Sequence, residues 1–197
     1  LRAQAPKANG QMTELIASMN RLLCESTGAN NYATFFYATL DWRTRRLTYV
    51  NAGHNPPLLI RPGARSNVAG ALNGGAQSNN GSVSVSLARA HVSHSREAIS
   101  LLTTGGPVIG LLENCVYEHS TIELRSGDVL VAYTDGLSDA RNPEGEEFGE
   151  DRLVQMIVDH AELPVHEMRD RIFSNIHSWQ RGEPQFDDMT MVIVKVK

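Results

Sequence analysis

Apolar residues along the chain fall into short blocks whose spacing predicts separate helical and extended segments. In residues 11–26 they recur every three or four positions, which places them on one face of a helix. That face consists of Met12, Leu15, Ile16, Met19, Leu22 and Leu23. Residues 32–41 and 45–53 are instead rich in β-branched and aromatic side chains. The short connection between these two blocks predicts a β-hairpin.

Further apolar blocks predict more strands. The stretch PPLLI at 56–60 is a short strand candidate, and 117–124 is another. Residues 129–135, VLVAYTD, predict a buried strand because their apolar run is nearly continuous. The last block, DDMTMVIVKVK at 187–197, predicts a strand that begins directly after two aspartates.

Two helices are expected between the last two strands. Helices are predicted near 150–161 and 164–180, the second with Pro164 in its first turn, where proline is tolerated. Glu150 and Asp151 would lie in the first turn of the earlier helix, where negative charge interacts favourably with the helix dipole. The order of elements indicates an α+β fold, with antiparallel strands and helices laid outside them.

Composition changes between residues 64 and 96, which are dominated by Ser, Asn, Gly and Ala. Such a segment buries too little apolar surface to offset the entropy lost on ordering. We expect a low-complexity surface insertion within a single domain that spans 1–197, and a linker between two domains is the alternative. His91 and His94 lie in this segment at a spacing that could serve a metal, although solvated histidines are the simpler interpretation.

Charge and cysteine content exclude several classes of protein. The net charge is −4, so no basic patch indicates a nucleic-acid partner. No apolar run approaches the roughly 18 residues of a membrane-spanning helix, and the N-terminal residues lack the apolar core of a signal peptide. Cys24 and Cys115 are too few for a disulfide scaffold, which favours two reduced, buried thiols in a cytoplasmic protein.

Three aspartates stand where two apolar strands are predicted to end and begin. Asp135 closes the strand at 129–135, and Asp187 and Asp188 precede the last strand. If these strands pair antiparallel, the carboxylates converge at one edge of the sheet, where their mutual repulsion calls for a divalent cation. Hard oxygen ligands suit magnesium, manganese or calcium. The alternative is an ordinary Asp-Gly turn and a solvated Asp-Asp cap.

Four blocks in this order resemble one family. They are NAGHNPPLLI, GGPVIGLL, YTDGLSDARNPEGEEFGEDRL and the terminal DDMTMVIV. Together they resemble the bacterial metal-dependent serine/threonine phosphatases of the PPM type, in the branch typified by the stage II sporulation protein E phosphatase domain. The resemblance implies two antiparallel sheets packed face to face with helices on both outer sides, an α-β-β-α sandwich. It also implies Mn²⁺ or Mg²⁺, two ions in a complete domain, with Asp135 and Asp187 as ligands and Asp139 as a further, weaker ligand.

The chain departs from the family pattern in two places. The family's domain begins with a Gly-Asp block whose aspartate bridges both metal ions, and the sole Gly-Asp here, Gly127-Asp128, belongs to the turn before residue 129. We therefore expect the C-terminal portion of such a domain, incomplete at its N-terminus, as a fragment of a longer chain or a degenerate relative. The insertion at 64–96 stands where relatives have a much shorter loop.

The function implied by the resemblance is hydrolysis of phosphoserine or phosphothreonine on a regulatory protein by metal-activated water, without a protein nucleophile. Relatives act on anti-sigma-factor antagonists in partner-switching pathways, so such a phosphoprotein is the implied partner. Two alternatives stay open: an inactive module that binds a phosphoprotein, and a structural fragment completed by another chain. Missing ligands predict weak metal binding, and uncovered apolar surface predicts self-association.

Other prominent side chains are assigned to structure rather than chemistry. His54 in NAGHNPP is expected to shape a turn, with a position at the mouth of the site as the alternative. Tyr133 and Trp179 are predicted core residues. The acidic run at 143–152 is expected to be an exposed turn that leads into a helix.

Overall fold

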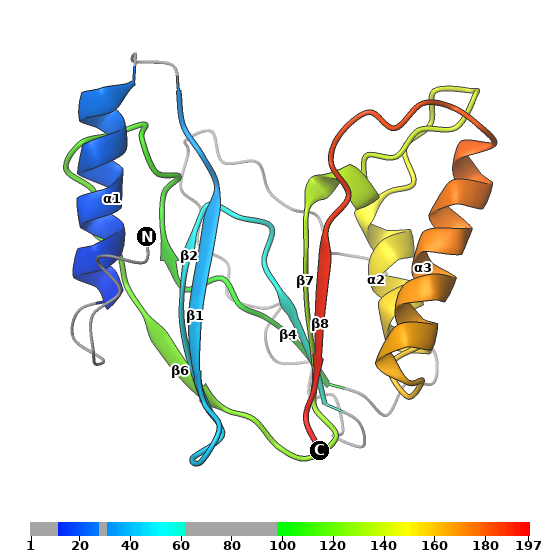
Figure 1. Ribbon diagram of the computed structural model, residues 1–197, viewed down its shortest axis with the longest axis horizontal. Coiled ribbons are helices and arrows are strands. Elements are labelled where there is room, and N and C mark those ends of the chain that lie inside the picture. The colour runs from blue at the N-terminus through cyan, green and yellow to red at the C-terminus, as the bar shows by residue number, and fades with distance from the viewer. Residues whose placement is uncertain (1–11, 28–30, 62–97) are drawn as a thin grey trace, which may run out of the picture. The chain divides into compact units, whose positions relative to one another are not determined.

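The computed structural model describes residues 12–27, 31–61 and 98–197, and the chain divides into two compact units. The first unit comprises Leu1–Leu58, Leu101–Ser126 and Val196–Lys197, and the second comprises Leu59–Ser100 and Gly127–Lys195. Two sheets and three α-helices confirm the predicted α+β class (Figure 1). The expected insertion at 64–96 lies outside the described residues, and so do the two histidines in it.

The first unit is built on a hairpin whose second strand is central to its sheet. Its strands are β1 (Phe35–Asp41), β2 (Arg46–Ala52), β5 (Gly105–Gly106) and β6 (Ser120–Glu123). β1 pairs antiparallel with β2 along its whole length, which confirms the predicted hairpin. β6 also pairs antiparallel with β2, whereas the short β5 runs parallel to it. The predicted strand at 117–124 is shortened to the four residues of β6.

Helix α1 (Met12–Ser26) packs on β2 through the predicted apolar face (Figure 1). Met12, Leu15 and Ile16 are buried on this face. Leu22 is 53% exposed, so its predicted place on the buried face is wrong. Leu22 is exposed because, in the second half of the helix, the polar side chain of Asn20 faces the protein instead. The buried cluster beneath the helix contains Met12, Ile16, Val50, Ala52, Ile109 and Tyr117.

Asn20 is fully buried because its side chain satisfies the backbone of a distant loop. The Asn20 Oδ1 accepts the N–H of Gly110 at 2.8 Å. Its Nδ2 donates to the carbonyl oxygens of Leu112 at 2.8 Å and Glu113 at 3.0 Å. One amide therefore pairs three backbone groups, and buried polar groups left unpaired are costly.

The two cysteines are free but only half-buried, so their predicted burial is wrong in degree. Cys115 lies on the loop that Asn20 holds, and its Sγ is 3.1 Å from the carbonyl oxygen of Leu112. Cys24 lies one turn after Asn20 near the end of α1. Burial raises the pKa of Tyr117 to about 12, with smaller contributions from the Cys115 and Cys24 side chains.

The second unit contains a four-stranded sheet in the order β4-β3-β7-β8. The strands are β3 (Leu58–Arg61), β4 (Ala98–Leu101), β7 (Val129–Tyr133) and β8 (Met191–Lys195), the first two of which reach the boundary between the units. β7 and β8, both predicted as strands from their apolar runs, pair antiparallel with Tyr133 opposite Met191. Both strands are shorter than predicted, because the chain turns at Asp135 and the ladder proper begins only at Met191.

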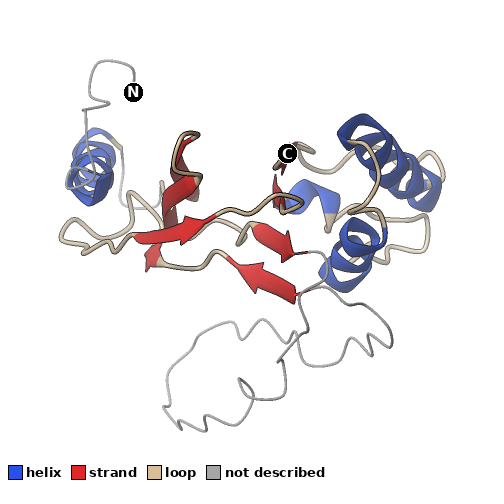
Figure 2. Ribbon diagram, turned by 90° about the horizontal axis from the view of Figure 1, so that it is seen from below, coloured by secondary structure: helices blue, strands red, loops and turns tan. Residues whose placement is uncertain are grey.

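Helices α2 (Glu150–Asp159) and α3 (Val165–Gln180) agree with the predicted positions. They lie side by side, and α3 packs on β8 (Figure 1, Figure 2). Their buried side chains are Leu153, Ile157, Val158, Met168, Ile172, Ile176 and Gln180. Pro164 is the N-cap of α3 rather than a first-turn residue, because its ψ of 144° is extended.

Asp128, in the turn before β7, is buried and forms an ion pair with Arg61 at 3.4 Å.

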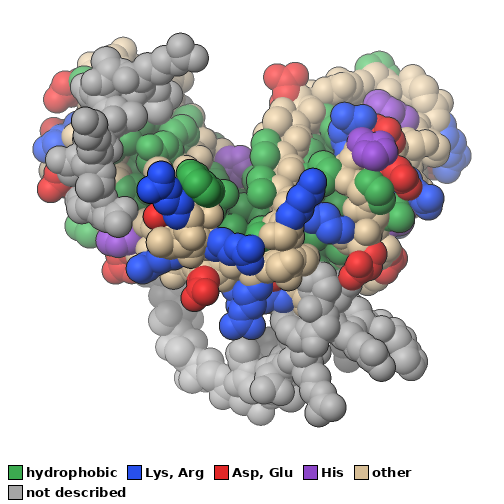
Figure 3. Space-filling view, turned by 60° about the horizontal axis from the view of Figure 1, so that its bottom comes forward, with side chains coloured by type: hydrophobic (Ala, Val, Ile, Leu, Met, Phe, Trp, Pro, Cys, Tyr) green, Lys and Arg blue, Asp and Glu red, His purple; other side chains and the backbone are tan. Residues whose placement is uncertain are grey.

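Large apolar side chains remain exposed in both units. The most exposed are Tyr32, Trp42, Leu112, Val116 and Phe186. The space-filling view of Figure 3 shows basic and acidic side chains on one face, with apolar side chains visible between them. Among the described residues, no helix has both the length and the apolar character needed to cross a membrane.

Asn20→Ala should lower the free energy of unfolding by about 2–4 kcal/mol, because it leaves a buried N–H and two carbonyls without their partner. Urea denaturation followed by circular dichroism measures the change. Asn175→Ala is the matched control, since Asn175 is an exposed helical asparagine that donates only to the Arg171 carbonyl in the preceding turn. The control should change stability by less than about 0.5 kcal/mol. Equal effects of the two substitutions would contradict the role given to Asn20.

Candidate metal centre

The adjoining ends of β7 and β8 bring together the segments that carry the candidate ligands. Thr134 extends the ladder by one step, since its N–H donates to the Thr190 carbonyl at 3.0 Å. The Thr134 hydroxyl accepts the N–H of Thr190 at 2.9 Å and donates to the Asp188 carbonyl at 2.7 Å. Three bonds from one threonine hold the backbone before Asp135 against the backbone that follows Asp187.

Gly136 brings the two segments into direct contact. A Cβ atom at this position would lie 2.5 Å from the Asp188 carbonyl oxygen and 3.0 Å from the Asp187 carbonyl oxygen. Side chains do not tolerate such distances to backbone atoms, so the glycine permits the approach. The Asp135–Gly136 peptide therefore lies against the Asp187–Asp188 peptide. The structure thus brings the two aspartate-bearing segments together through their backbones, and the convergence of their carboxylates stays a prediction.

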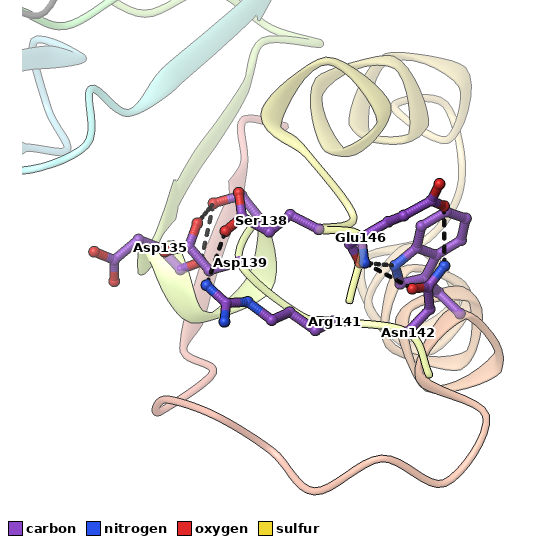
Figure 4. A network of polar contacts seen from close by, with 8 residues as sticks. Asp135, Ser138, Asp139, Arg141, Asn142 and Glu146 are labelled. Carbon is purple, nitrogen blue, oxygen red and sulfur yellow. Dashed lines mark hydrogen bonds and ion pairs between the residues drawn. The ribbon is translucent and has the colours of Figure 1, made fainter. Parts of the chain in front are cut away.

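Asp135 opens a short 3-10 helix, Asp135–Leu137, instead of closing β7. Its carboxylate is exposed and points away from the Ser138 and Asp139 side chains (Figure 4). The turn is closed by the Asp139 N–H, which donates to the Asp135 carbonyl at 2.8 Å. The Asp135 carboxylate is therefore free to bind a ligand from solvent, and its backbone is fixed on both sides.

Asp139 lies in the same turn, four residues after Asp135, and is half-buried. Its Oδ1 lies 3.1 Å from the Ser138 hydroxyl, which is also 2.9 Å from the Asp135 carbonyl oxygen (Figure 4). Burial raises the pKa of Asp139. The Ser138 hydrogen bond opposes that shift, the charges of Asp135 and Glu147 add to it, and Arg141 opposes it. The charge of Asp135 thus adds to the rise in the pKa of Asp139, although burial contributes more.

Asp187 and Asp188 are exposed on the segment before β8. The Asp187 Oδ1 accepts the N–H of Asp188 at 2.7 Å, and the Asp187 carbonyl accepts a bond from Gln185 Nε2 at 2.8 Å. One carboxylate oxygen of Asp187 is therefore occupied by its own backbone. The exposure of both aspartates is compatible with the structural alternative of a solvated Asp-Asp cap as well as with a metal site.

The donor chemistry of these residues fits a hard divalent cation, but their number does not complete a coordination shell. Asp135, Asp139, Asp187 and Asp188 offer carboxylate and carbonyl oxygens, which Mg²⁺, Mn²⁺ and Ca²⁺ prefer. Within the described residues, however, no group of three or more His, Cys, Asp and Glu side chains is placed to hold a metal. That Asp135 and Asp187 share one cation stays a prediction.

The turn at NAGH is held by Asn51, which sequence reasoning did not single out. The buried Asn51 side chain accepts the N–H of His54 at 2.8 Å and donates to the carbonyl oxygens of His54 at 2.9 Å and Leu102 at 3.1 Å. Gly53 adopts a φ of 73°, and a side chain there would meet Val108. The predicted turn is confirmed, but the His54 ring only contacts the neighbouring Asn55 carbonyl oxygen at 2.8 Å.

The acidic run after Asp139 is an ordered, exposed hairpin turn. Buried Asn142 accepts the Glu146 N–H at 2.8 Å, and its own N–H donates to the Glu146 carbonyl at 3.0 Å. The Trp179 indole N–H of α3 donates to the same carbonyl at 3.2 Å, and the Arg181 side chain pairs with Glu144 at 2.9 Å. Trp179 is thus half-buried against this turn, and its predicted core position is wrong.

Tyr133 is buried as predicted, and its hydroxyl donates to Glu150 at 3.1 Å. Burial and the Glu150 carboxylate both raise the pKa of Tyr133 well above its ordinary value. Glu150 lies in the first turn of α2, as expected, so the end of β7 is tied to the start of that helix.

Comparison with protein-family models identifies the family of this chain. The model of the family described as stage II sporulation protein E (SpoIIE) matches residues 1–74 and 79–197. The chain belongs to the SpoIIE family. This confirms the resemblance drawn from the four sequence blocks, and it covers both compact units.

Three relatives are similar in sequence over most of the chain. Protein IcfG of Synechocystis is 28% identical over 163 residues, which cover 83% of this chain and 20% of that protein. Phosphoserine phosphatase RsbP of Bacillus subtilis is 24% identical, with 94% of this chain and 36% of that protein covered. Phosphoserine phosphatase RsbU of the same organism is 21% identical, with 98% and 47% covered. The chain thus spans from about a fifth to about half of the length of these relatives.

Solved structures show the same fold. The SiaA-PP2C domain of Pseudomonas aeruginosa superposes with a TM-score of 0.66 at 18% identity, covering 94% of this chain and 61% of that one. The RsbU and RsbW domains of Rv1364c from Mycobacterium tuberculosis give a TM-score of 0.59 at 20% identity, covering 98% and 43%. The chain therefore has the fold of PP2C-type phosphatase domains.

Gly136→Ala should reduce stability and displace the Asp187–Asp188 segment, because the added methyl group meets backbone oxygen atoms rather than a flexible side chain. We expect a loss of about 1–3 kcal/mol in urea denaturation. Gly145→Ala is the control: that glycine has a φ of 79° but open space around it, so only the backbone strain of about 1 kcal/mol applies. A structure of Gly136→Ala with the two aspartate segments unmoved would contradict the contact.

Asp139→Asn, measured in EDTA, should raise the free energy of unfolding near pH 7. The raised pKa of Asp139 means that its ionised form opposes folding above the ordinary value of 3.8, so removing the charge stabilises the fold there. The gain should vanish below about pH 3.5, where both folded and unfolded chains are protonated. Asp41→Asn is a control of opposite sign, because hydrogen bonds from Thr44 and Arg43 lower the pKa of Asp41. A stability gain from Asp139→Asn that does not depend on pH would contradict this account.

Proposed function

We propose that this chain is the phosphatase part of a protein that hydrolyses phosphoserine or phosphothreonine on a regulatory protein with a divalent cation. The observation that supports it best is the contact of the Asp135–Gly136 and Asp187–Asp188 peptides at the paired ends of β7 and β8. RsbP and RsbU, both phosphoserine phosphatases, support the reaction class.

The proposed cation is Mn²⁺ or Mg²⁺, with two ions in a complete site. Asp135 and Asp187 are the proposed ligands, and Asp139 and Asp188 are additional candidates. When bound, such an ion supplies an activated water and neutralises charge on the phosphoryl oxygens. The chain's own contribution is positional: Thr134 fixes the ligand segments, Gly136 lets them meet, and the exposed Asp135 carboxylate stays accessible.

The proposed partner is a phosphorylated protein. An anti-sigma-factor antagonist in a partner-switching pathway is the specific proposal, because the relatives named RsbP and RsbU resemble this chain along most of its length. A cytoplasmic location goes with such a partner and stays a prediction.

A second candidate is a module that binds a phosphoprotein without turning it over. It is favoured by one observation: the described residues contain no group of three side chains placed to hold a metal. A site with few ligands binds hydrated Mg²⁺ or Mn²⁺ weakly, since these ions release water reluctantly.

Hydrolysis of a phosphoserine peptide, followed by phosphate release over a Mn²⁺ titration, separates the two candidates. We expect turnover that is slow and requires high Mn²⁺, and that Asp135→Asn lowers it at least about a hundredfold. Asp170→Asn is the matched control, because Asp170 is an exposed aspartate on α3 paired only with Arg169. Binding of the peptide without any turnover would favour the second candidate. Turnover that survives Asp135→Asn would remove the proposed site.

A further inference from the structure

Arg141 and Phe186 join the two segments that carry the candidate ligands. Arg141 follows Asp139 by two residues, and Phe186 directly precedes Asp187. The Arg141 guanidinium carbon lies 4.8 Å from the centroid of the Phe186 ring. This distance is typical of a cation–π contact. The pair therefore lies beside the proposed metal ligands on both segments.

Both side chains face solvent. Phe186 is 70% exposed, and the Arg141 side chain is 48% exposed. An exposed aromatic ring beside an arginine combines the two residue types that dominate binding energy at protein interfaces. Phe186 adds little to the core of its own unit, so its packing surface is available to a partner.

Arg141 retains hydrogen-bonding capacity toward an anion. Its ion pair with Glu147 at 3.1 Å uses one of the five N–H donors of the guanidinium. The group also lies near Asp139 (Figure 4), and its charge partly offsets the rise in the pKa of that carboxyl. A guanidinium placed this way can bind phosphoryl oxygens through two parallel N–H bonds.

The surroundings of Arg141 are strongly acidic, so an anionic substrate needs a local positive charge there. The described acidic residues on the two segments are Asp135, Asp139, Glu144, Glu146, Glu147, Glu183, Asp187 and Asp188. The nearby Arg181 is paired with Glu144, and Arg152 donates to the Glu147 and Phe148 carbonyls while it stacks on Trp179. Arg141 is thus the cation of these described segments best placed to offset repulsion of a phosphate.

We propose that Arg141 and Phe186 form the recognition rim for the phosphorylated segment of the substrate, with Arg141 binding a phosphoryl oxygen and Phe186 packing on an apolar residue beside the phosphoserine. This inference rests on the proposed function for its substrate class. It adds a specificity: the rim favours a phosphoserine flanked by large apolar side chains over one flanked by glycine.

The competing interpretation is a brace, in which the Arg141–Phe186 contact only holds the Asp187 segment in place. The two interpretations differ in what a substitution changes. A brace acts through the aspartates, so its loss would weaken Mn²⁺ binding. A recognition rim acts on the peptide, so its loss would leave Mn²⁺ binding unchanged and weaken peptide binding.

The test uses fluorescent peptides that carry the non-hydrolysable phosphonate analogue of phosphoserine between two leucines or two glycines. Fluorescence anisotropy gives their affinity for the full 197-residue chain in saturating Mn²⁺, and electron paramagnetic resonance gives the Mn²⁺ affinity.

Arg141→Ala should weaken binding of both peptides by about tenfold or more. Arg141→Lys should weaken it less, because the charge remains without the planar fork. Phe186→Ala should weaken binding of the leucine peptide severalfold and leave the glycine peptide unchanged. Arg169→Ala, an exposed arginine paired with Asp170, should change nothing.

Three results would contradict the proposed recognition rim. They are no measurable binding of either peptide to the unaltered chain, binding of the peptides by Arg141→Ala as tight as by the unaltered chain, and a loss of Mn²⁺ affinity in Arg141→Ala that matches its loss of peptide affinity. Failure of the proposed function looks different. In that case the unaltered chain would release no phosphate from a hydrolysable phosphoserine peptide, yet would bind the phosphonate peptide in an Arg141-dependent way.

Discussion

The antiparallel pairing of β7 with β8 is the constraint on which the candidate site depends. The register that sets Tyr133 opposite Met191 determines which residues meet where the two strands separate. Thr134 carries the pairing one step further with three hydrogen bonds. A slip of one residue would turn every side chain of β7 to the other face of the sheet and move Asp135 away from the Asp187 segment.

Carboxylates gathered in this way carry an electrostatic cost, and the structure shows how part of it is reduced. Asp187 turns one oxygen onto the N–H of Asp188, and the Ser138 hydroxyl lies against Asp139. Asp135 remains exposed, where water screens its charge. The pKa of Asp139 is nevertheless raised, chiefly by burial and to a smaller extent by the charges of Asp135 and Glu147.

The hairpin turn after Asp139 connects the site to helix α3. Trp179 and Arg181, at the end of that helix, bond to Glu146 and Glu144 on the turn. Arg141 at the base of the same turn reaches Phe186, on the segment that follows α3. The position of the proposed rim is therefore set by α3 as well as by the sheet, and the helix itself packs on β8.

Most of the elements of this protein, and its family, could be predicted from the order of its residues. Apolar spacing located α1, because burial of one face imposes a spacing that survives in the order of residues, and α2, α3 and the principal strands of the described residues were also placed from the sequence. The four sequence blocks indicated the SpoIIE family and the aspartates, and the family match confirmed the former. Which polar residues hold the fold together could be seen only in the folded chain. Asn20, Asn51 and Gly136 carry no periodic signal, and each acts on a backbone segment far away in sequence. The exposure of Leu22 and the contact of Arg141 with Phe186 arise in the same way, since they depend on which distant segments the fold brings alongside.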